Sequence, residues 1–309
     1  MTTQNLARII SPKSKSDITH PKTTTPRFDS LSPSIRKPDF NNRHQGSQSL
    51  KELSNENTCQ EHLLQKNGYT ISRVNSLKQR IKTNTFIKHM YASRGYLTES
   101  ATAFSDNPNQ ITFQASIDEI IVGTVTLQID SDKGLLADEL YQRTIDEFRK
   151  KGRKVCELSK FALDPQHSSK EIIASLFQVA YIYAHKIYKA TDYFCEVNPR
   201  HAGPQKRMFG FRQIGKQRTC PRVDAPAVLL HLEMNYVDEQ ITSLEGSSAS
   251  EHRSLYSYFL TKHDKVKLVN KIQSKLIEKQ LSSRLQTKTK QNQLPFTDNW
   301  VKAPLTFDM

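Results

Sequence analysis

The pattern of apolar and polar residues changes near residue 74. Residues 1–60 contain few apolar residues and show no periodicity, whereas 74–236 follow patterns typical of helices and strands. Ile111–Ile117 alternates with a period of two, and a run rich in Ile, Val and Thr follows at 119–130. Both runs predict strands, and a third strand is predicted at 155–163.

Apolar residues at helical spacing predict helices between these strands. One follows Val74 and ends near Gly95, and another covers 140–151 and ends at Gly152. A longer helix begins at Ser168 or Ser169, which are good N-cap residues, and a short one covers 200–209 before Gly210. Further strands are expected at 193–197, 211–218 and 227–234. The alternating order predicts an α/β layered fold of about 160 residues, large enough for one core.

The two ends of the chain have a different character. Residues 1–73 are polar and basic, so we expect a mostly disordered tail. Residues 237–309 combine apolar residues at roughly helical spacing with several lysines, which predicts a basic helical extension and a tail. This extension has two interpretations: it docks on its own domain, or it contacts a partner or the surface of a membrane.

Charge narrows the classes of partner. The 309 residues contain 45 Lys+Arg and 31 Asp+Glu, a net charge of +14, with +5 in 1–73, +6 in 74–236 and +3 in 237–309. Such an excess favours nucleic acid, an anionic membrane or an acidic protein. No apolar run is long enough to cross a membrane, and no secretion signal is recognisable at the start. Four cysteines without CxxC spacing support neither a metal site nor disulfides, so we expect a cytoplasmic protein.

Glu157 is the most unusual residue of the predicted core. A period of two places it and Ser159 on the same face of the strand as Val155, Phe161 and Leu163. Burial raises the pKa of a carboxyl toward the range of a general base. The alternative is an ion pair with Lys160 or an arginine at the edge of the sheet.

The segment after this strand, Asp164–Ser169, leads into the long helix. A strand–loop–helix unit directs free backbone N–H groups at an anion above the helix N-terminus. The loop has no glycine-rich run to wrap a pyrophosphate, which argues against a tightly held nucleotide or free coenzyme A.

Several stretches together resemble a known family. In order and composition they look like the FeeM-type N-acyl amino acid synthases, members of the GNAT acyltransferase superfamily and relatives of the acyl-homoserine-lactone autoinducer synthases. The resemblance implies a GNAT-like fold, with a mixed central sheet flanked by helices. The matching stretches are YASRGY at 91–96, VGTVTLQID at 122–130, ELSKFAL at 157–163, NPRH at 198–201, FGF at 209–211 and APAVLL at 225–230.

The resemblance implies transfer of a long-chain acyl group from acyl carrier protein to the α-amine of an amino acid. The donor is then an acyl-phosphopantetheine thioester, with no tightly bound cofactor and no metal. Glu157 is the implied base, with Ser159 and Lys160 positioning substrate beside it. The pantetheine arm would lie where the strands ending near Leu163 and Val197 diverge. Candidate substrate-binding residues are Tyr91, Arg94, Arg200 and His201.

The chain departs from the family pattern at three positions. Lys160 replaces the usual arginine, which keeps the charge but loses the bidentate fork. Gln205 stands where a tyrosine is usual, and Pro204 is expected to interrupt the helix. These departures favour a second hypothesis, a catalytically silent GNAT-like module that binds an acidic partner. A third hypothesis is an autoinducer synthase that uses S-adenosylmethionine.

Basic residues near the expected cleft suggest how an acidic carrier protein would dock, because opposite charge speeds encounter. The alternative is an ordinary solvated basic face, and no nucleic-acid-binding motif is present. The candidate docking residues are Arg149, Lys150, Lys151, Arg153, Lys206 and Arg207.

Overall fold

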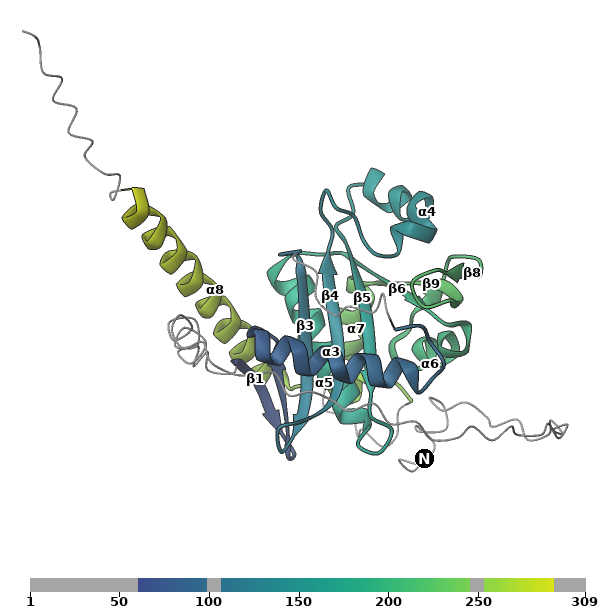
Figure 1. The fold of residues 1–309 in the computed structure, drawn as a ribbon, viewed down its shortest axis with the longest axis horizontal. Coiled ribbons are helices and arrows are strands. Elements are labelled where there is room, and N and C mark those ends of the chain that lie inside the picture. Colours follow the sequence, from purple (N-terminus) through teal and green to yellow (C-terminus); the bar gives the residue numbers. More distant parts are fainter. Residues whose placement is uncertain (1–60, 99–106, 245–252, 292–309) are drawn as a thin grey trace, which may run out of the picture. The chain divides into compact units, whose positions relative to one another are not determined.

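A computed structural model of the chain describes residues 61–98, 107–244 and 253–291. Contacts divide the chain into two units, 1–259 and 260–309. In the first unit a sheet of nine strands has the order β1-β2-β3-β4-β5-β6-β9-β7, and β8 pairs with β9 (Figure 1). Neighbouring strands are antiparallel except β5 and β6, which are parallel.

The strands and helices of the first unit alternate along most of the chain. The strands are β1 (Glu61–Lys66), β2 (Tyr69–Arg73), β3 (Gln110–Ile117), β4 (Ile120–Ile129), β5 (Val155–Leu163), β6 (Asp192–Val197), β7 (Arg212–Gln213), β8 (Arg218–Cys220) and β9 (Ala225–Glu233). The helices are α3 (Leu77–Ala92), α4 (Asp138–Lys150), α5 (Lys170–Tyr181), which continues into a π-helical turn at Ile182–Ile187, α6 (Pro199–Phe209) and α7 (Met234–Ser243), with a 3-10 turn at Tyr256–Tyr258. The layered α/β fold predicted from the sequence is confirmed.

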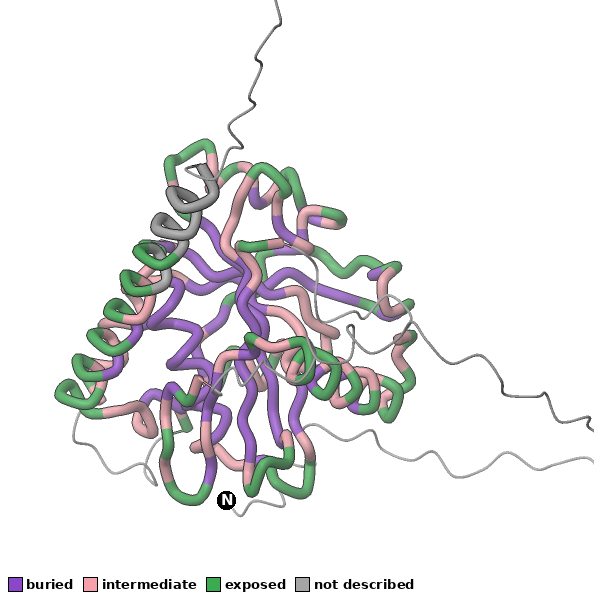
Figure 2. Tube along the Cα trace, turned by 60° about the vertical axis from the view of Figure 1, so that its left-hand side comes forward, coloured by how far each residue is buried: buried purple, intermediate pink, exposed green. Residues whose placement is uncertain are grey.

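Helices cover both faces of the sheet. Figure 1 shows α3 crossing one face of β3, β4 and β5, while α5 lies behind them. On the α5 face the packing is apolar: Phe113 contacts the ring of Tyr183, with the centroids 4.9 Å apart. The α3 face is more polar, because Thr112 and Thr126 bond to each other and Gln114 accepts a hydrogen bond from Thr83 of α3. Buried residues concentrate in the central strands and in α5 (Figure 2).

The sheet begins earlier than the sequence predicts. Residues 61–73, expected to belong to the tail, form the β1–β2 hairpin, which pairs with β3. Asn67 and Gly68 form its turn with φ of 46° and 79°, so both adopt the left-handed region that a two-residue hairpin needs. The expectation for residues 1–60 lies outside the described residues.

The domain also ends later than expected. The expected boundary at 236 falls inside α7, and the first unit extends to Phe259. The second unit contains α8 (Lys262–Gln291), which confirms a helix in the C-terminal extension. Thr261 begins it by accepting a hydrogen bond from the backbone of Asp264. None of the described helices is long and apolar enough to cross a membrane.

Two local predictions about α6 and β5 need correction or refinement. Pro204 lies within α6 without ending it, so the expected interruption is wrong. The strand β5 contains a bulge, because Thr124 pairs with Ala162 but Thr126 pairs with Ser159. Lys160 has a φ of 51° there, and its carbonyl accepts a hydrogen bond from the Thr124 hydroxyl at 3.0 Å.

The bulge changes which residues share a face. Ala162 packs with Ile87 and Met90 of α3, so it lies on the face of Glu157 and Ser159. Leu163 lies on the α5 side, next to Gly123 and Leu176. The expectation that Glu157 shares its face with Phe161 and Leu163 is therefore wrong, because the bulge shifts the alternation by one residue.

Candidate active site

A cavity of about 540 Å³ opens between β5 and β6. The two strands pair only from Val155–Asp192 to Glu157–Phe194. Beyond that point they diverge, and residues 157–161 of β5 and 195–198 at the end of β6 line the cavity. The cleft expected from the sequence between the ends of these strands is therefore present. Along these stretches, the edges of β5 and β6 that would otherwise pair with each other face the cavity.

Glu157 lines this cavity and is 2% exposed. One of its carboxylate oxygens accepts a hydrogen bond from the Ala137 amide at 3.0 Å, just before α4. Burial raises the pKa of Glu157 to about 7, opposed by the amides of Ala137 and Leu136. A pKa near neutrality suits a group that accepts a proton and later releases it.

The ion pair between Glu157 and Lys160 that the sequence left open is not formed. Within the described part of the chain, neither a hydrogen bond nor an ion pair joins the two side chains. Burial lowers the pKa of Lys160 to about 8, with a further decrease from Arg222 that Glu157 opposes. The Ser159 hydroxyl is also buried and has no hydrogen-bond partner in the described structure.

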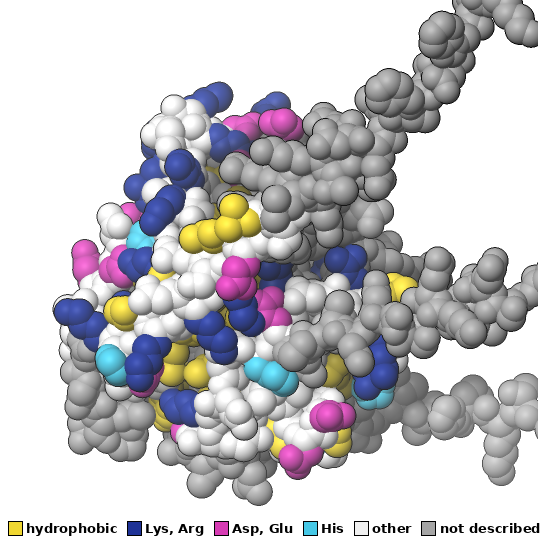
Figure 3. All heavy atoms as spheres, turned by 90° about the vertical axis from the view of Figure 1, so that its left-hand side faces the viewer, with side chains coloured by type: hydrophobic (Ala, Val, Ile, Leu, Met, Phe, Trp, Pro, Cys, Tyr) yellow, Lys and Arg dark blue, Asp and Glu magenta, His cyan; other side chains and the backbone are white. Residues whose placement is uncertain are grey.

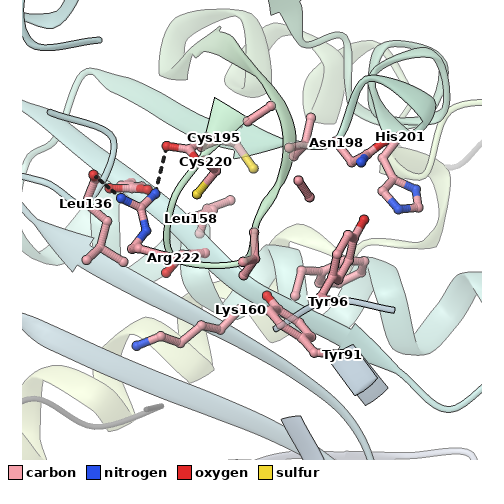
Figure 4. A pocket seen from close by; sticks show the side chains of 18 of the residues that line it. Tyr91, Tyr96, Leu136, Leu158, Lys160, Cys195, Asn198, His201, Cys220 and Arg222 are labelled. Carbon is pink, nitrogen blue, oxygen red and sulfur yellow. Dashed lines mark hydrogen bonds and ion pairs between the residues drawn. The ribbon is translucent and has the colours of Figure 1, made fainter. Parts of the chain in front are cut away.

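A second carboxylate, Glu196 on β6, lies across the cavity. It pairs with Arg222 at 2.8 Å, and Arg222 also contacts Glu139. Figure 4 shows the Arg222 guanidinium directed at Leu136, whose carbonyl accepts a hydrogen bond from it. Sequence reasoning did not assign a role to Glu196. Its position beside Cys195 on a predicted strand near the cleft was the available signal, but the Arg222 pairing depends on a loop 26 residues away.

The opposite end of the cavity carries Tyr91, Tyr96, Asn198 and His201 (Figure 4). Asn198 caps α6 by accepting from the Arg200 amide, and Pro199 occupies the first helical position. The Arg200 guanidinium donates to the Tyr96 hydroxyl at 2.6 Å and stacks over its ring. Burial, Arg200 and Arg94 together lower the pKa of His201 to about 4, so its imidazole is neutral.

All seven catalytic and substrate-binding candidates lie at or beside this cavity. Six of them line it, and Arg200 adjoins it through Tyr96 and His201. Gln205, which replaces the usual tyrosine, also lines it. The structure thus brings together residues from α3, β5 and α6 that lie up to 110 positions apart.

The docking candidates separate into two groups. Arg149 pairs with Asp130, Asp138 and Asp146. Arg153 pairs with Asp192 at 2.6 Å, beside the joined ends of β5 and β6. Both charges are neutralised by carboxylates of the domain, which argues against a docking role for these two arginines. Lys150, Lys151, Lys206 and Arg207 are exposed, and the last two lie on α6.

Nothing in the described residues resembles a metal centre, because no group of three or more His, Cys, Asp or Glu side chains is arranged to hold an ion.

The divergent parallel strands, the bulged β5 and the buried carboxylate between them define the class of this domain: an N-acyltransferase with the GNAT fold. Within that class, residues 82–233, just under half of the chain, match the family described as N-acyl amino acid synthase FeeM. The resemblance expected from the sequence motifs is therefore confirmed.

Solved structures similar to this chain include two transferases. FeeM, an N-acyl amino acid synthase from uncultured soil microbes, is 26% identical, with a TM-score of 0.50 over 54% of this chain and 90% of its own. An N-acetyltransferase structure from Lactobacillus plantarum is 11% identical, with a TM-score of 0.41 over 54% of this chain and 99% of its own. No curated protein matches the sequence.

Proposed function

We propose that this protein transfers a long-chain acyl group from the thioester of acyl carrier protein to the α-amine of an amino acid. The observation that carries the proposal is Glu157, a buried carboxyl with a pKa of about 7 at the point where β5 and β6 diverge. Such a group accepts the proton that an attacking amine must lose.

Glu157 and its neighbours in the cavity can support each step of this reaction. The neutral amine attacks the thioester carbonyl, a C–N bond forms, and the nitrogen passes its proton to Glu157. Collapse of the intermediate breaks the C–S bond and releases the carrier thiol. The β5 bulge, which takes Lys160 and Phe161 out of the regular ladder opposite Val125, supplies backbone amides for the oxyanion.

The departing thiolate needs a proton, and Gln205 cannot supply one. Tyr96 is the candidate donor, since its hydroxyl accepts a hydrogen bond from Arg200 and keeps its own proton available. The adjacent guanidinium also stabilises the phenolate that forms. Arg200 is exposed beside the cavity and thus suits the phosphate of the pantetheine arm.

Exposed basic residues of α6 support an acidic donor protein. Lys and Arg side chains are scattered over the face in Figure 3, with Asp and Glu among them. The exposed pair Lys206 and Arg207 lies on the helix that also lines the cavity, which favours that end for docking. Charge steering of this kind weakens as salt rises.

The test compares donors at equal concentration: a long-chain acyl carrier protein and the matching acyl-coenzyme A, each with a mixture of amino acids. We expect N-acyl amino acids, with kcat/KM higher for the carrier protein and falling as salt rises. A preference for coenzyme A would contradict the carrier as donor. Acyl-homoserine lactone from S-adenosylmethionine would favour the autoinducer synthase, and no product with folded protein would favour the silent module.

A further inference from the structure

One arm of the cavity is polar and includes the Lys160 ammonium, which has no counter-ion among the described residues. Its walls are Asn107, Gln110, Gln128, Lys133, Ser159 and Lys160, which we call the acceptor arm. Gln128 is buried and donates to the carbonyl of Gly134 at 2.8 Å. An aliphatic chain placed against these groups would remove them from water without replacing their hydrogen bonds.

The Lys160 ammonium points away from Tyr91, Tyr96 and His201 (Figure 4). Within the described residues it makes no hydrogen bond or ion pair. A partly buried cation without a partner is costly, which accounts for its lowered pKa. An anionic ligand would remove this cost.

The chemistry of the acceptor decides which anion this is. The α-amine and the α-carboxylate of an amino acid are attached to one carbon. If Glu157 receives a proton from the amine, the carboxylate must lie next to Glu157 as well. A cation close to Glu157 but not bonded to it is therefore in the right place.

The other cations near the cavity are paired, lie at its other end, or are exposed to solvent. Arg222 is held by Glu139, Glu196 and the carbonyl of Leu136. Arg200 contacts Tyr96 at the other end of the cavity, where Arg94 also lies near Tyr91 and Tyr96. Lys133 is exposed on the loop before α4.

We propose that Lys160 binds the α-carboxylate of the acceptor amino acid and so selects amino acids over simple amines. This inference rests on the proposed function. The bulge of β5 gives it a structural basis, since Lys160 stands in the bulge and lines the cavity together with Glu157 and Ser159.

The test measures kcat/KM for L-serine, L-glutamine, L-leucine and L-tyrosine, each beside its α-amide. In the wild type we expect the best amino acid to exceed its amide by roughly ten- to hundredfold, the range of one charged hydrogen bond. Lys160→Gln should lose most of this preference by raising KM for the acid, with the amide within about threefold of the wild-type value. Lys160→Arg should restore the preference, because it keeps the charge. The exposed Lys154→Gln is the matched control.

Two results would overturn the inference: an unchanged preference in Lys160→Gln, or an equal loss for acid and amide, which would indicate a structural role for the bulge. These outcomes differ from failure of the proposed function, in which the wild type acylates none of the four amino acids or their amides.

Discussion

Glu157→Gln separates the catalytic role of this carboxyl from its effect on stability. In the wild type the Ala137 amide donates to Glu157 at 3.0 Å. The glutamine oxygen can accept the same hydrogen bond, so the fold should be retained. The variant removes the proton acceptor, and loss of a general base typically costs about 10²–10⁴ in rate. We therefore expect product formation to fall by about this factor.

Glu157→Gln should lower the rate, but at high pH it should raise the free energy of unfolding. Folding raises the pKa of Glu157 from 4.5 to about 7, so the folded state holds the proton more tightly. Below pH 4.5 the carboxyl is protonated in both the folded and the unfolded state, so it does not make the free energy of unfolding depend on pH. As pH rises toward 7 the unfolded state releases its proton first, so the folded protein loses stability, at most about 3 kcal/mol.

Urea unfolding at pH 5 and pH 8.5 measures this difference. Relative to wild type, Glu157→Gln should gain about 1–3 kcal/mol at pH 8.5 and much less at pH 5. Glu147→Gln, an exposed carboxyl on α4, is the control and should change neither stability nor rate. The reasoning is refuted if Glu157→Gln turns over at the wild-type rate, or if its stability follows the same pH curve as the wild type.

Three further predictions concern pH, docking and the buried charge network. The rate should rise with pH through about 7 as Glu157 ionises, and the acceptor KM should rise above about 8 as Lys160 loses its proton; profiles of kcat and KM that are flat across this range would contradict both. Charge reversal at Lys206 and Arg207 should weaken binding of acyl carrier protein at low salt, and an unchanged Kd would remove that end of the cavity from docking. Asp192→Ala should cost about 3–5 kcal/mol in urea unfolding, because it leaves Arg153 and His231 without their buried partner; a loss below 1 kcal/mol would argue against that network.

Local sequence signals were sufficient for most of the fold. Gly95 and Gly210 mark the ends of helices as expected, with φ of 73° and 81°, and Ser169 caps α5. The β1–β2 hairpin was missed because only a few of its residues are apolar. The Asn67-Gly68 turn between two short strand-like segments was the signal that could have identified it.

The site was predictable only in part, because its decisive features are non-local. The bulge at Lys160 depends on Thr124 of the neighbouring strand, 36 residues earlier. The charge of Arg153 is neutralised by Asp192, 39 residues later. A single sequence shows that such residues exist but not which of them meet. Glu157 was identifiable because a carboxylate within a strand of the core is conspicuous without any partner.

The most direct test of the account is mass spectrometry of lipids from cells that express the wild-type chain, compared with cells that express Glu157→Gln at equal level. The account predicts long-chain N-acyl amino acids with the wild type and their near absence with the variant. Wild-type cells that accumulate no such lipid, or variant cells that accumulate as much, would contradict it.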